Sequence, residues 1–236
     1  MEAGTLEDRV VVVTGAAGSL GPVVVRRLAE RGPHLCLCGR EQAPLDELAK
    51  EVGDAETQAI DLLDADATTA WADDLTRRRG GIDAVVHLVG GWRGGKPIEE
   101  SPPEDWDFLH DLLVRTTQNV TRAVASPLLA SGRGRFVIVS SGQAQAPTSG
   151  NAAYAAAKAA AEAWTLALAD RFKGSGATAN VVVVGAIVTE EMRAESPDKD
   201  FSTFTPAEEI AEAIAYLCSD AAASMNGQRL TLRGAA

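Results

Sequence analysis

Short apolar runs alternate along the whole chain with longer stretches in which apolar residues recur at helical spacing. The runs are rich in valine and contain few polar positions, which is typical of strands that are buried on both faces of a parallel sheet. Because a helical stretch separates almost every pair of runs, we predict a doubly wound, mostly parallel α/β sheet with helices on both faces. The seven predicted strands are 10–14, 34–38, 57–61, 84–89, 135–141, 178–184 and 228–232.

The stretches between these strands predict the helices. A long helix is expected from Glu104 to Leu129, and an alanine-rich helix includes the segment YAAAKAAAEAW at 154–164. The segment 189–206 is long, polar and without clear periodicity, so we expect a loop that acts as a lid or is disordered. No linker, repeat or low-complexity segment divides the chain, and we predict a single domain over 1–236. Other predicted helices are 20–32, 44–53, 67–81 and 206–220.

Composition narrows the class of protein. The 236 residues carry a net charge of −11, which argues against nucleic acid or an anionic membrane as a partner. No apolar run approaches the roughly 20 residues that a membrane span requires. The N-terminal MEAGTLEDRVVVV lacks the layout of a signal peptide, so we expect a cytoplasmic protein. Cys36 and Cys38 share one face of a predicted strand and are interpreted as core residues, and we predict no disulfide framework and no metal site.

Three glycines stand between the first strand and the first helix, at Gly15, Gly18 and Gly21. Glycine permits unusual dihedral angles, and it lets a phosphate approach the backbone because no Cβ intervenes. The helix that follows presents free N–H groups and its positive dipole end to such a phosphate. At the first strand-to-helix junction of a doubly wound sheet, this turn predicts a dinucleotide site.

The end of the second strand indicates which dinucleotide is bound. Enzymes that use NAD place a carboxylate there for the ribose 2′-hydroxyl, whereas an arginine accommodates a 2′-phosphate. Here Gly39 occupies the position of the acid, and Arg40 follows it. We therefore favour NADP(H), with NAD(H) as the alternative; a solvated Arg40 beside Glu41 is the competing interpretation.

Tyr154 and Lys158 lie four residues apart, and hence on one face of the alanine-rich helix. Such pairs are common by chance, so the rest of the chain has to decide whether this pair has a function.

The chain as a whole resembles the short-chain dehydrogenase/reductase family. TGAAGSLG is similar to the family's cofactor loop, IDLLD to its third-strand segment, and VIVSSG with Tyr154 and Lys158 to its serine and Tyr-x-x-x-Lys elements. Ser141 lies thirteen residues before Tyr154, as is usual in the family. The resemblance implies that Ser141, Tyr154 and Lys158 are catalytic, and that Tyr154 and Lys158 also contact the cofactor. It implies further cofactor contacts at Gly15, Ala17, Gly18, Ser19, Leu20, Gly21, Arg40, Asp61, Leu62, Val89, Gly90, Gly185, Ile187 and Thr189.

The chemistry explains why tyrosine and lysine are paired. Reduction of a ketone requires a hydride and a proton, and the tyrosine hydroxyl can provide the proton. Its ordinary pKa of about 10 is high for exchange at neutral pH, so we expect the neighbouring ammonium of Lys158 and an oxidised nicotinamide to lower the pKa of Tyr154. Ser141 is expected to hydrogen-bond the carbonyl oxygen at the carboxyl end of the fifth strand.

Three departures from the family pattern stand out. A glycine at 18 replaces the usual one at the place of Ser19, and His87-Leu88-Val89-Gly90 replaces an Asn-Asn-Ala-Gly stretch. We interpret His87 as a packed strand-end residue rather than a catalytic one. Third, Leu113 stands where the family has its catalytic asparagine, and Asn119, nearly two turns further, should face elsewhere. The proton relay is then arranged differently, or turnover is slow, or the protein binds cofactor with little catalysis.

Other features concern the substrate and the assembly. Trp92 lines the substrate entrance or merely caps a surface, and the resemblance makes 189–206 a substrate loop whose Met192 and Phe204 cover the pocket. The long helix and the alanine helix are expected to pair in a homodimer or homotetramer, with packing inside the monomer as the alternative.

The leading hypothesis is an NADP(H)-dependent oxidoreductase that interconverts a small carbonyl compound and its alcohol. The alternatives are a cofactor-binding protein with little or no turnover, and an isomerase or lyase with no net redox change.

Overall fold

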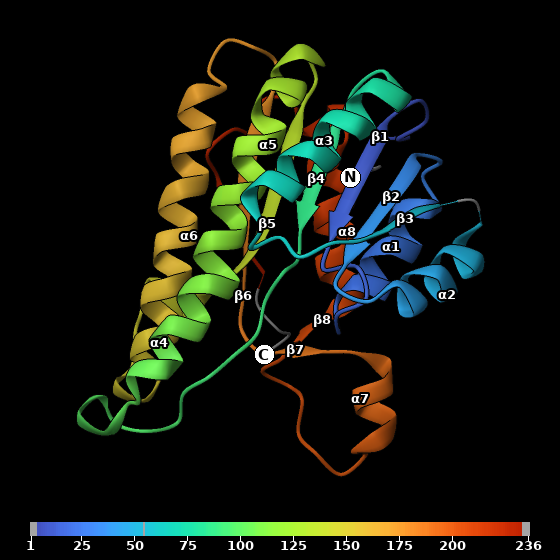
Figure 1. Ribbon diagram of the computed structural model, residues 1–236. Coiled ribbons are helices and arrows are strands. Elements are labelled where there is room, and N and C mark those ends of the chain that lie inside the picture. Colours follow the sequence, from blue (N-terminus) through green and yellow to red (C-terminus); the bar gives the residue numbers. More distant parts are fainter. Residues whose placement is uncertain (1–3, 54, 233–236) are drawn as a thin grey trace.

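A single central sheet, covered by helices on both faces, forms the body of the molecule (Figure 1). The computed structural model describes residues 4–53 and 55–232. Seven strands lie in the order β3-β2-β1-β4-β5-β6-β9, and every neighbouring pair is parallel. The predicted single-domain, doubly wound α/β fold is therefore confirmed. The strands are β1 Val10–Thr14, β2 His34–Gly39, β3 Glu56–Ala59, β4 Ala84–His87, β5 Arg135–Ser141, β6 Thr178–Val184 and β9 Arg229–Thr231.

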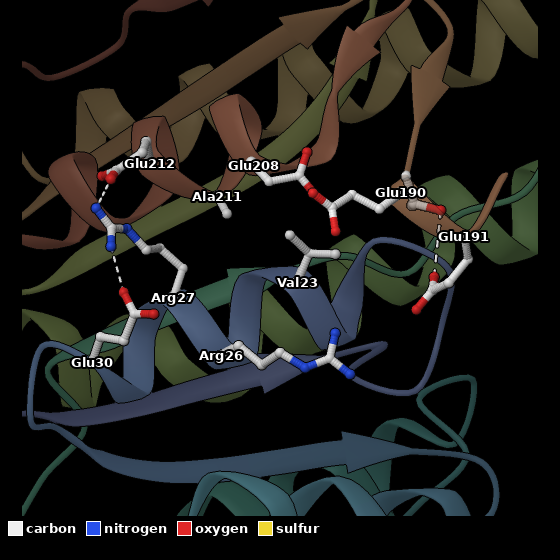
Figure 2. A pocket seen from close by; sticks show the side chains of 10 residues that line it. Val23, Arg26, Arg27, Glu30, Glu190, Glu191, Glu208, Ala211 and Glu212 are labelled. Atoms are coloured by element: carbon white, nitrogen blue, oxygen red, sulfur yellow. Dashed lines mark hydrogen bonds and ion pairs between the residues drawn. The ribbon is translucent and has the colours of Figure 1, made fainter. Parts of the chain in front are cut away.

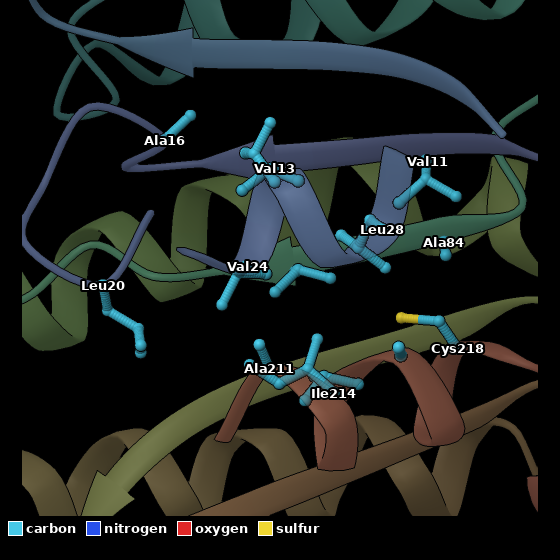
Figure 3. Close-up of a cluster of buried hydrophobic side chains, with 14 of the residues drawn as sticks. Val11, Val13, Ala16, Leu20, Val24, Leu28, Ala84, Ala211, Ile214 and Cys218 are labelled. Carbon is cyan, nitrogen blue, oxygen red and sulfur yellow. The ribbon is translucent and has the colours of Figure 1, made fainter. Parts of the chain in front are cut away.

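The valine runs of β1, β4, β5 and β6 are apolar because both faces of these strands are buried. Val11 and Val13 of β1 belong to one core cluster, and Val10 and Val12 belong to the other. The first cluster fills the space between the sheet and helices α1 (Gly21–Ala29) and α8 (Ala207–Cys218), where Val24, Leu28 and Ile214 meet the strands (Figure 3). Cys36 and Cys38 lie in the second cluster as free, buried thiols, so the prediction that they are core residues is confirmed.

The helices divide between the two faces. Helices α1, α2 and α8 contribute to the first core cluster, and α3, α5 and α6 contribute to the second. No helix among the described residues is long and apolar enough to cross a membrane. The helices are α1 Gly21–Ala29, α2 Gln42–Val52, α3 Ala65–Arg79, α4 Pro103–Leu109, α5 Thr116–Ala130, α6 Ala152–Arg171, α7 Glu190–Glu195 and α8 Ala207–Cys218.

The long helix differs from its prediction in one local feature. The helical path from Pro103 to Ala130 contains a π-helical segment, His110–Arg115, between α4 and α5. Such segments are rare and often occur at functional sites. Leu113, the residue at the place of the family's asparagine, lies inside it.

The segment 189–206 also differs from its prediction, because it is not a continuous loop. It contains α7, and β8 (Thr205–Pro206) at its end pairs in parallel with β7 (Ile187–Val188). Thr189 caps α7, since its hydroxyl accepts a hydrogen bond of 3.2 Å from the Met192 backbone N–H. Two glutamates in the first turn favour the same helix start through the helix dipole.

Candidate functional site

The strand order places a crevice at one edge of the sheet. The chain leaves β1 towards β2 and β3 on one side, and continues with β4, β5, β6 and β9 on the other. Ligands of open α/β sheets bind at such a reversal point, outside the carboxyl ends of the strands. Two adjoining cavities of about 690 and 540 Å³ lie there. They share Gly15, Gly18, Leu88, Val89 and Gly90 along their common wall.

Every residue predicted to be catalytic or to contact the cofactor lines at least one of these cavities. The larger cavity, here called the reaction cavity, contains the three predicted catalytic residues. The smaller, here called the adenosine cavity, contains the predicted cofactor residues nearest β2 and β3. The reaction cavity is lined by Gly15, Gly18, Ser19, Leu20, Gly21, Val89, Gly90, Ser141, Tyr154, Lys158, Gly185, Ile187 and Thr189, and the adenosine cavity by Gly15, Ala17, Gly18, Arg40, Asp61, Leu62, Val89 and Gly90.

The glycine turn has the geometry that close approach of a phosphate requires. Gly15 has a φ of 74°, and a Cβ there would lie 2.9 Å from backbone atoms of Leu88 and Val89. At Gly21, the first residue of α1, a Cβ would lie 2.1 Å from the Ala16 carbonyl oxygen. The chain's own backbone thus requires glycine at both positions, and the start of α1 at Gly21 lines the larger cavity. These residues fit the pyrophosphate of a dinucleotide.

The predicted catalytic residues come together from two elements. Ser141 ends β5, and Tyr154 and Lys158 lie one turn apart on α6. The Ser141 hydroxyl is hydrogen-bonded to Tyr154. The Nζ atom of Lys158 lies 5.8 Å from the centre of the Tyr154 ring, and it donates a hydrogen bond of 2.9 Å to the Val139 carbonyl oxygen. The three side chains therefore meet on one wall of the reaction cavity.

Burial dominates the electrostatics of this group. It raises the pKa of Tyr154, and only the hydrogen bond from Ser141 acts in the opposite direction. The protein's own groups thus make the phenol harder to ionise than usual, and the expected lowering of its pKa by Lys158 together with an oxidised nicotinamide stays a prediction. Burial lowers the pKa of Lys158 to about 8, against the favourable charge of Glu162. Lys158 is consequently mostly protonated at neutral pH, but close to its titration point.

Leu113 lies where the resemblance places an asparagine, and its environment is apolar. It is buried in a small cluster with Leu109, Val114 and Ala157, against which Tyr154 packs. This apolar wall contributes to the desolvation of the phenol. Asn119 faces elsewhere, as predicted, because its Nδ2 donates hydrogen bonds of 2.9 and 3.1 Å to the carbonyl oxygens of Leu62 and Leu63.

His87 is a packed residue, as interpreted from the sequence. Its Nδ1 lies 2.7 Å from the Thr14 hydroxyl, and its Nε2 lies 3.2 Å from the Thr116 hydroxyl. Burial, together with the charge of Lys158, lowers the pKa of His87 to about 3. The uncharged ring thus joins β1, β4 and the start of α5, in the region where the family has asparagine.

The adenosine cavity has a basic residue at its rim. Arg40 follows the end of β2, is exposed, and lines this cavity together with Asp61. The Asp61 carboxylate accepts a hydrogen bond of 3.0 Å from the Leu63 backbone N–H, which fixes the turn after β3. Glu41 and Asp111 also line this cavity, so its lining contains one basic and three acidic side chains.

Some of the residues expected at the mouth of the reaction cavity line it, and others do not. Trp92 and Met192 line it, as expected, and the Trp92 Nε1 donates a hydrogen bond of 3.0 Å to the Asn151 Oδ1. Phe204 does not line it; its ring packs edge-on against Phe201 at 5.2 Å instead, so that prediction is wrong. Gln143 lines the cavity two residues after Ser141 and was missed, because a short 3₁₀ turn brings it there.

A third hollow, of about 430 Å³, lies between α1, α8 and the start of α7 (Figure 2). Five glutamates line it, together with Arg26 and Arg27. Arg27 pairs with Glu30 and with Glu212, so part of this charge is neutralised locally. Among the described residues, no group of three or more His, Cys, Asp or Glu side chains is arranged to hold a metal ion.

Comparison with known proteins decides the family. A family model described as enoyl-(acyl carrier protein) reductase matches residues 15–234. The chain belongs to the short-chain dehydrogenase/reductase family. Members of this family are NAD(P)-dependent oxidoreductases, and this short-chain dehydrogenase/reductase is an enzyme of that class.

Curated relatives cover almost the whole of this short-chain dehydrogenase/reductase. It is 31% identical to a gluconate 5-dehydrogenase of Gluconobacter oxydans, over 94% of this chain and 92% of the relative. It is 30% identical to an acetoacetyl-CoA reductase of Allochromatium vinosum, over 96% of this chain and 97% of the relative. A solved short-chain type dehydrogenase/reductase from Mycobacterium ulcerans superposes with a TM-score of 0.88 at 26% identity, over 97% of this chain and 89% of that one.

Proposed function

We propose that this short-chain dehydrogenase/reductase interconverts a small ketone or aldehyde and its alcohol with NADP(H), with Tyr154 as general acid and base. The observation that carries the proposal is the meeting of Ser141, Tyr154 and Lys158 on one wall of the reaction cavity, beside the glycine turn. The curated relatives named above, a gluconate dehydrogenase and an acetoacetyl-CoA reductase, support chemistry between a carbonyl group and an alcohol.

The roles of the three side chains follow from their contacts. A bound nicotinamide supplies or accepts the hydride. In the direction of reduction, the Tyr154 hydroxyl donates its proton to the carbonyl oxygen as negative charge develops there. The Ser141 hydroxyl, which already bonds Tyr154, stabilises the same oxygen by a hydrogen bond. The ammonium of Lys158, 5.8 Å from the centre of the Tyr154 ring, stabilises the tyrosinate that remains.

The preference for NADP(H) rests on Arg40. A guanidinium binds a phosphate through parallel hydrogen bonds, which makes arginine the usual partner of a 2′-phosphate. Arg40 lines the adenosine cavity directly after β2, and Gly39 occupies the position of the acid that would select the 2′-hydroxyl of NAD. The acidic side chains of Glu41, Asp61 and Asp111 line the same cavity and oppose the binding of a phosphate there.

The lining of the reaction cavity narrows the substrate class. Near Ser141 and Tyr154, the wall consists of Trp92, Gln143 and Met192 with glycine and aliphatic residues. Among the described residues that line this cavity, Lys158 is the one basic side chain. Within that part of the chain, a substrate that carries its own carboxylate or phosphate finds no second cation, so we propose an uncharged carbonyl compound of mainly apolar character.

A second candidate function is supported by Leu113. A leucine has no polar group to hold a water molecule, and here it is buried against the tyrosine helix. A member of the family without this relay would bind the cofactor but turn over slowly. Measured rates of NADPH oxidation distinguish the two candidates.

The test is oxidation of NADPH by the purified protein across a panel of uncharged ketones, aldehydes and matched keto acids. Tyr154→Phe should lower kcat by about 10²–10⁴-fold, the size of a general acid contribution, and should leave the affinity for NADPH unchanged. Tyr216→Phe is the matched control, because Tyr216 lies on α8 and its hydroxyl donates a hydrogen bond of 3.2 Å to the Ala221 carbonyl oxygen. NADPH binding without oxidation by any carbonyl compound would support the second candidate instead.

A further inference from the structure

A buried carboxylate lies directly behind the catalytic group. Glu162 of α6 is 1% exposed and one turn beyond Lys158. Its oxygens accept hydrogen bonds from the Ser140 hydroxyl at 2.5 Å, from the Gln145 Nε2 at 2.8 and 2.7 Å, and from the Arg229 Nε at 2.6 Å. A buried ionised carboxylate is costly unless it is paired and hydrogen-bonded, and this one is both.

Two hydrogen-bond partners of Glu162 belong to the segment that forms one wall of the reaction cavity. Ser140 is the residue before Ser141 on β5, and Gln145 follows the 3₁₀ turn that carries Gln143 into the cavity. Lys158 and Glu162 reach two consecutive residues of β5, because Lys158 donates to the Val139 carbonyl oxygen and Glu162 accepts from Ser140. The two side chains thus join the same face of α6 to the end of the same strand.

Charge balance gives Glu162 a second effect. The titratable groups around Lys158 are His87 from β4, and Tyr154 and Glu162 from its own helix; Arg229 from β9 stands behind Glu162. His87 is uncharged and Tyr154 is a neutral phenol at neutral pH, so Glu162 is the anion of this group. Its charge favours the ammonium form of Lys158, which burial opposes.

We propose that Glu162 is a positioning residue of the reductase site, which anchors the Ser140–Gln145 segment and supplies the counter-charge of Lys158. This inference rests on the proposed function of Tyr154 and Lys158. In this proposal the Lys158 ammonium is supported by the Glu162 carboxylate, which lies on the same helix as Tyr154. The side chain of Leu113, in the neighbouring π-helical segment, is apolar and gives no such support.

The first experiment is the pH profile of kcat for NADPH oxidation with the best ketone of the panel. Activity should fall on the alkaline side as Lys158 loses its proton. In Glu162→Gln, that fall should move to lower pH by about one unit, because the charge that raises the pKa of Lys158 is removed and a neighbouring opposite charge shifts a pKa by that order. The KM for NADPH should change little, since Glu162 lines neither cavity.

Two controls separate this effect from a merely structural one. Ser140→Ala removes one hydrogen bond of Glu162 but leaves its charge, so the alkaline fall should stay at the wild-type pH. Asp170→Asn removes one negative charge from an exposed position on the same helix, where Asp170 pairs with Lys173, and should also leave the profile in place. An alkaline fall at the wild-type pH in a folded Glu162→Gln protein would overturn the proposal.

A second variant and a second readout keep the test decisive. If Glu162→Gln does not fold, Glu162→Gln with Arg229→Gln removes both charges of the pair and should show the same direction of shift. The pH dependence of urea unfolding, compared between each protein and its Lys158→Met derivative, reports the titration of Lys158 without turnover. If none of the carbonyl compounds of the panel supports NADPH oxidation by the wild-type protein, the proposed function fails. The unfolding comparison alone then still decides whether Glu162 acts on Lys158.

Discussion

The Nζ atom of Lys158 lies 5.8 Å from the centre of the Tyr154 ring, and both side chains line the reaction cavity at the carboxyl edge of the sheet. The lysine is held there by the Val139 carbonyl oxygen. Burial works against ionisation of both groups, since it raises the pKa of Tyr154 and lowers that of Lys158. The proposed chemistry therefore uses a phenol that stays protonated, and thus able to donate a proton, throughout the neutral range.

The pH dependence of stability provides a direct check on Lys158. Its pKa is about 8 in the folded protein and 10.5 ordinarily, so between these values the unfolded chain binds a proton that the folded protein does not. The Lys158 contribution to the free energy of unfolding is then constant below pH 8 and rises with pH above it, by at most about 1.4 kcal/mol per unit. The stability of wild type relative to Lys158→Met should rise accordingly from pH 8 towards pH 10.

Urea unfolding at several pH values measures this difference. Burial raises the pKa of the Cys36 and Cys218 thiols to about 12, so these thiols make stability fall with rising pH. Wild type and the variant share this contribution, and it cancels when their stabilities are compared. A difference that does not change with pH would show that Lys158 titrates normally in the folded protein.

Leu113 gives a prediction about the proton relay. If the apolar wall limits turnover, Leu113→Asn should raise kcat by about tenfold, the value of one additional hydrogen bond in the transition state. The same change places an amide at a position that is 2% exposed, so the free energy of unfolding should fall by about 1–3 kcal/mol. Steady-state kinetics and urea unfolding measure the two effects.

Val114→Asn is the matched control, since Val114 is 5% exposed in the same cluster. It should lose stability without any gain in kcat. Equal kcat values for wild type and Leu113→Asn would show that the site does not depend on a relay at this position.

Local patterns in the sequence predicted the sheet, the glycine turn and the pairing of Tyr154 with Lys158, whereas the resemblance to the family supplied most other residues of the two cavities. Valine runs mark the buried strands, the glycine turn marks the first crossover, and Tyr154 with Lys158 marks one helix face. The sequence also held a signal for α7 that was overlooked, namely Thr189 followed by two glutamates. Its capping geometry is local, and it identifies the helix once it is read as an N-cap.

Other features depend on contacts between distant segments. In the sequence, Glu162 has the pattern of an ordinary solvated helix residue. In the folded protein, β5, the turn after it and β9 place Ser140, Gln145 and Arg229 around its carboxylate. Phe204 was assigned to the pocket by resemblance, but its ring finds an apolar partner in Phe201. The π-helical segment around Leu113 likewise has no local signature in the sequence.

Arg40 gives a prediction about cofactor preference. Arg40→Ala should raise the KM for NADPH by about 10–100-fold, the range of a hydrogen-bonded charge, and should leave the KM for NADH unchanged or lower. Arg77→Ala is the control with the same loss of charge, because Arg77 is exposed on α3 and pairs there with Asp74. Equal effects of Arg40→Ala on the two cofactors would place the 2′-phosphate elsewhere.

The outer face of α6 gives a prediction about assembly. Ala156 and Ala163 are exposed on this helix, which lies at the side of the molecule opposite α2 (Figure 1). Small residues leave a helix surface flat enough for another helix to approach closely, so we expect α5 and α6 to pair with a second copy in a homodimer or homotetramer. Ala163→Glu should then reduce the molar mass measured by light scattering after size exclusion, and leave the protomer folded because the position is exposed. Ala43→Glu, an equally exposed alanine on α2, should leave the assembly intact, and a monomeric wild-type protein at micromolar concentration would contradict the prediction.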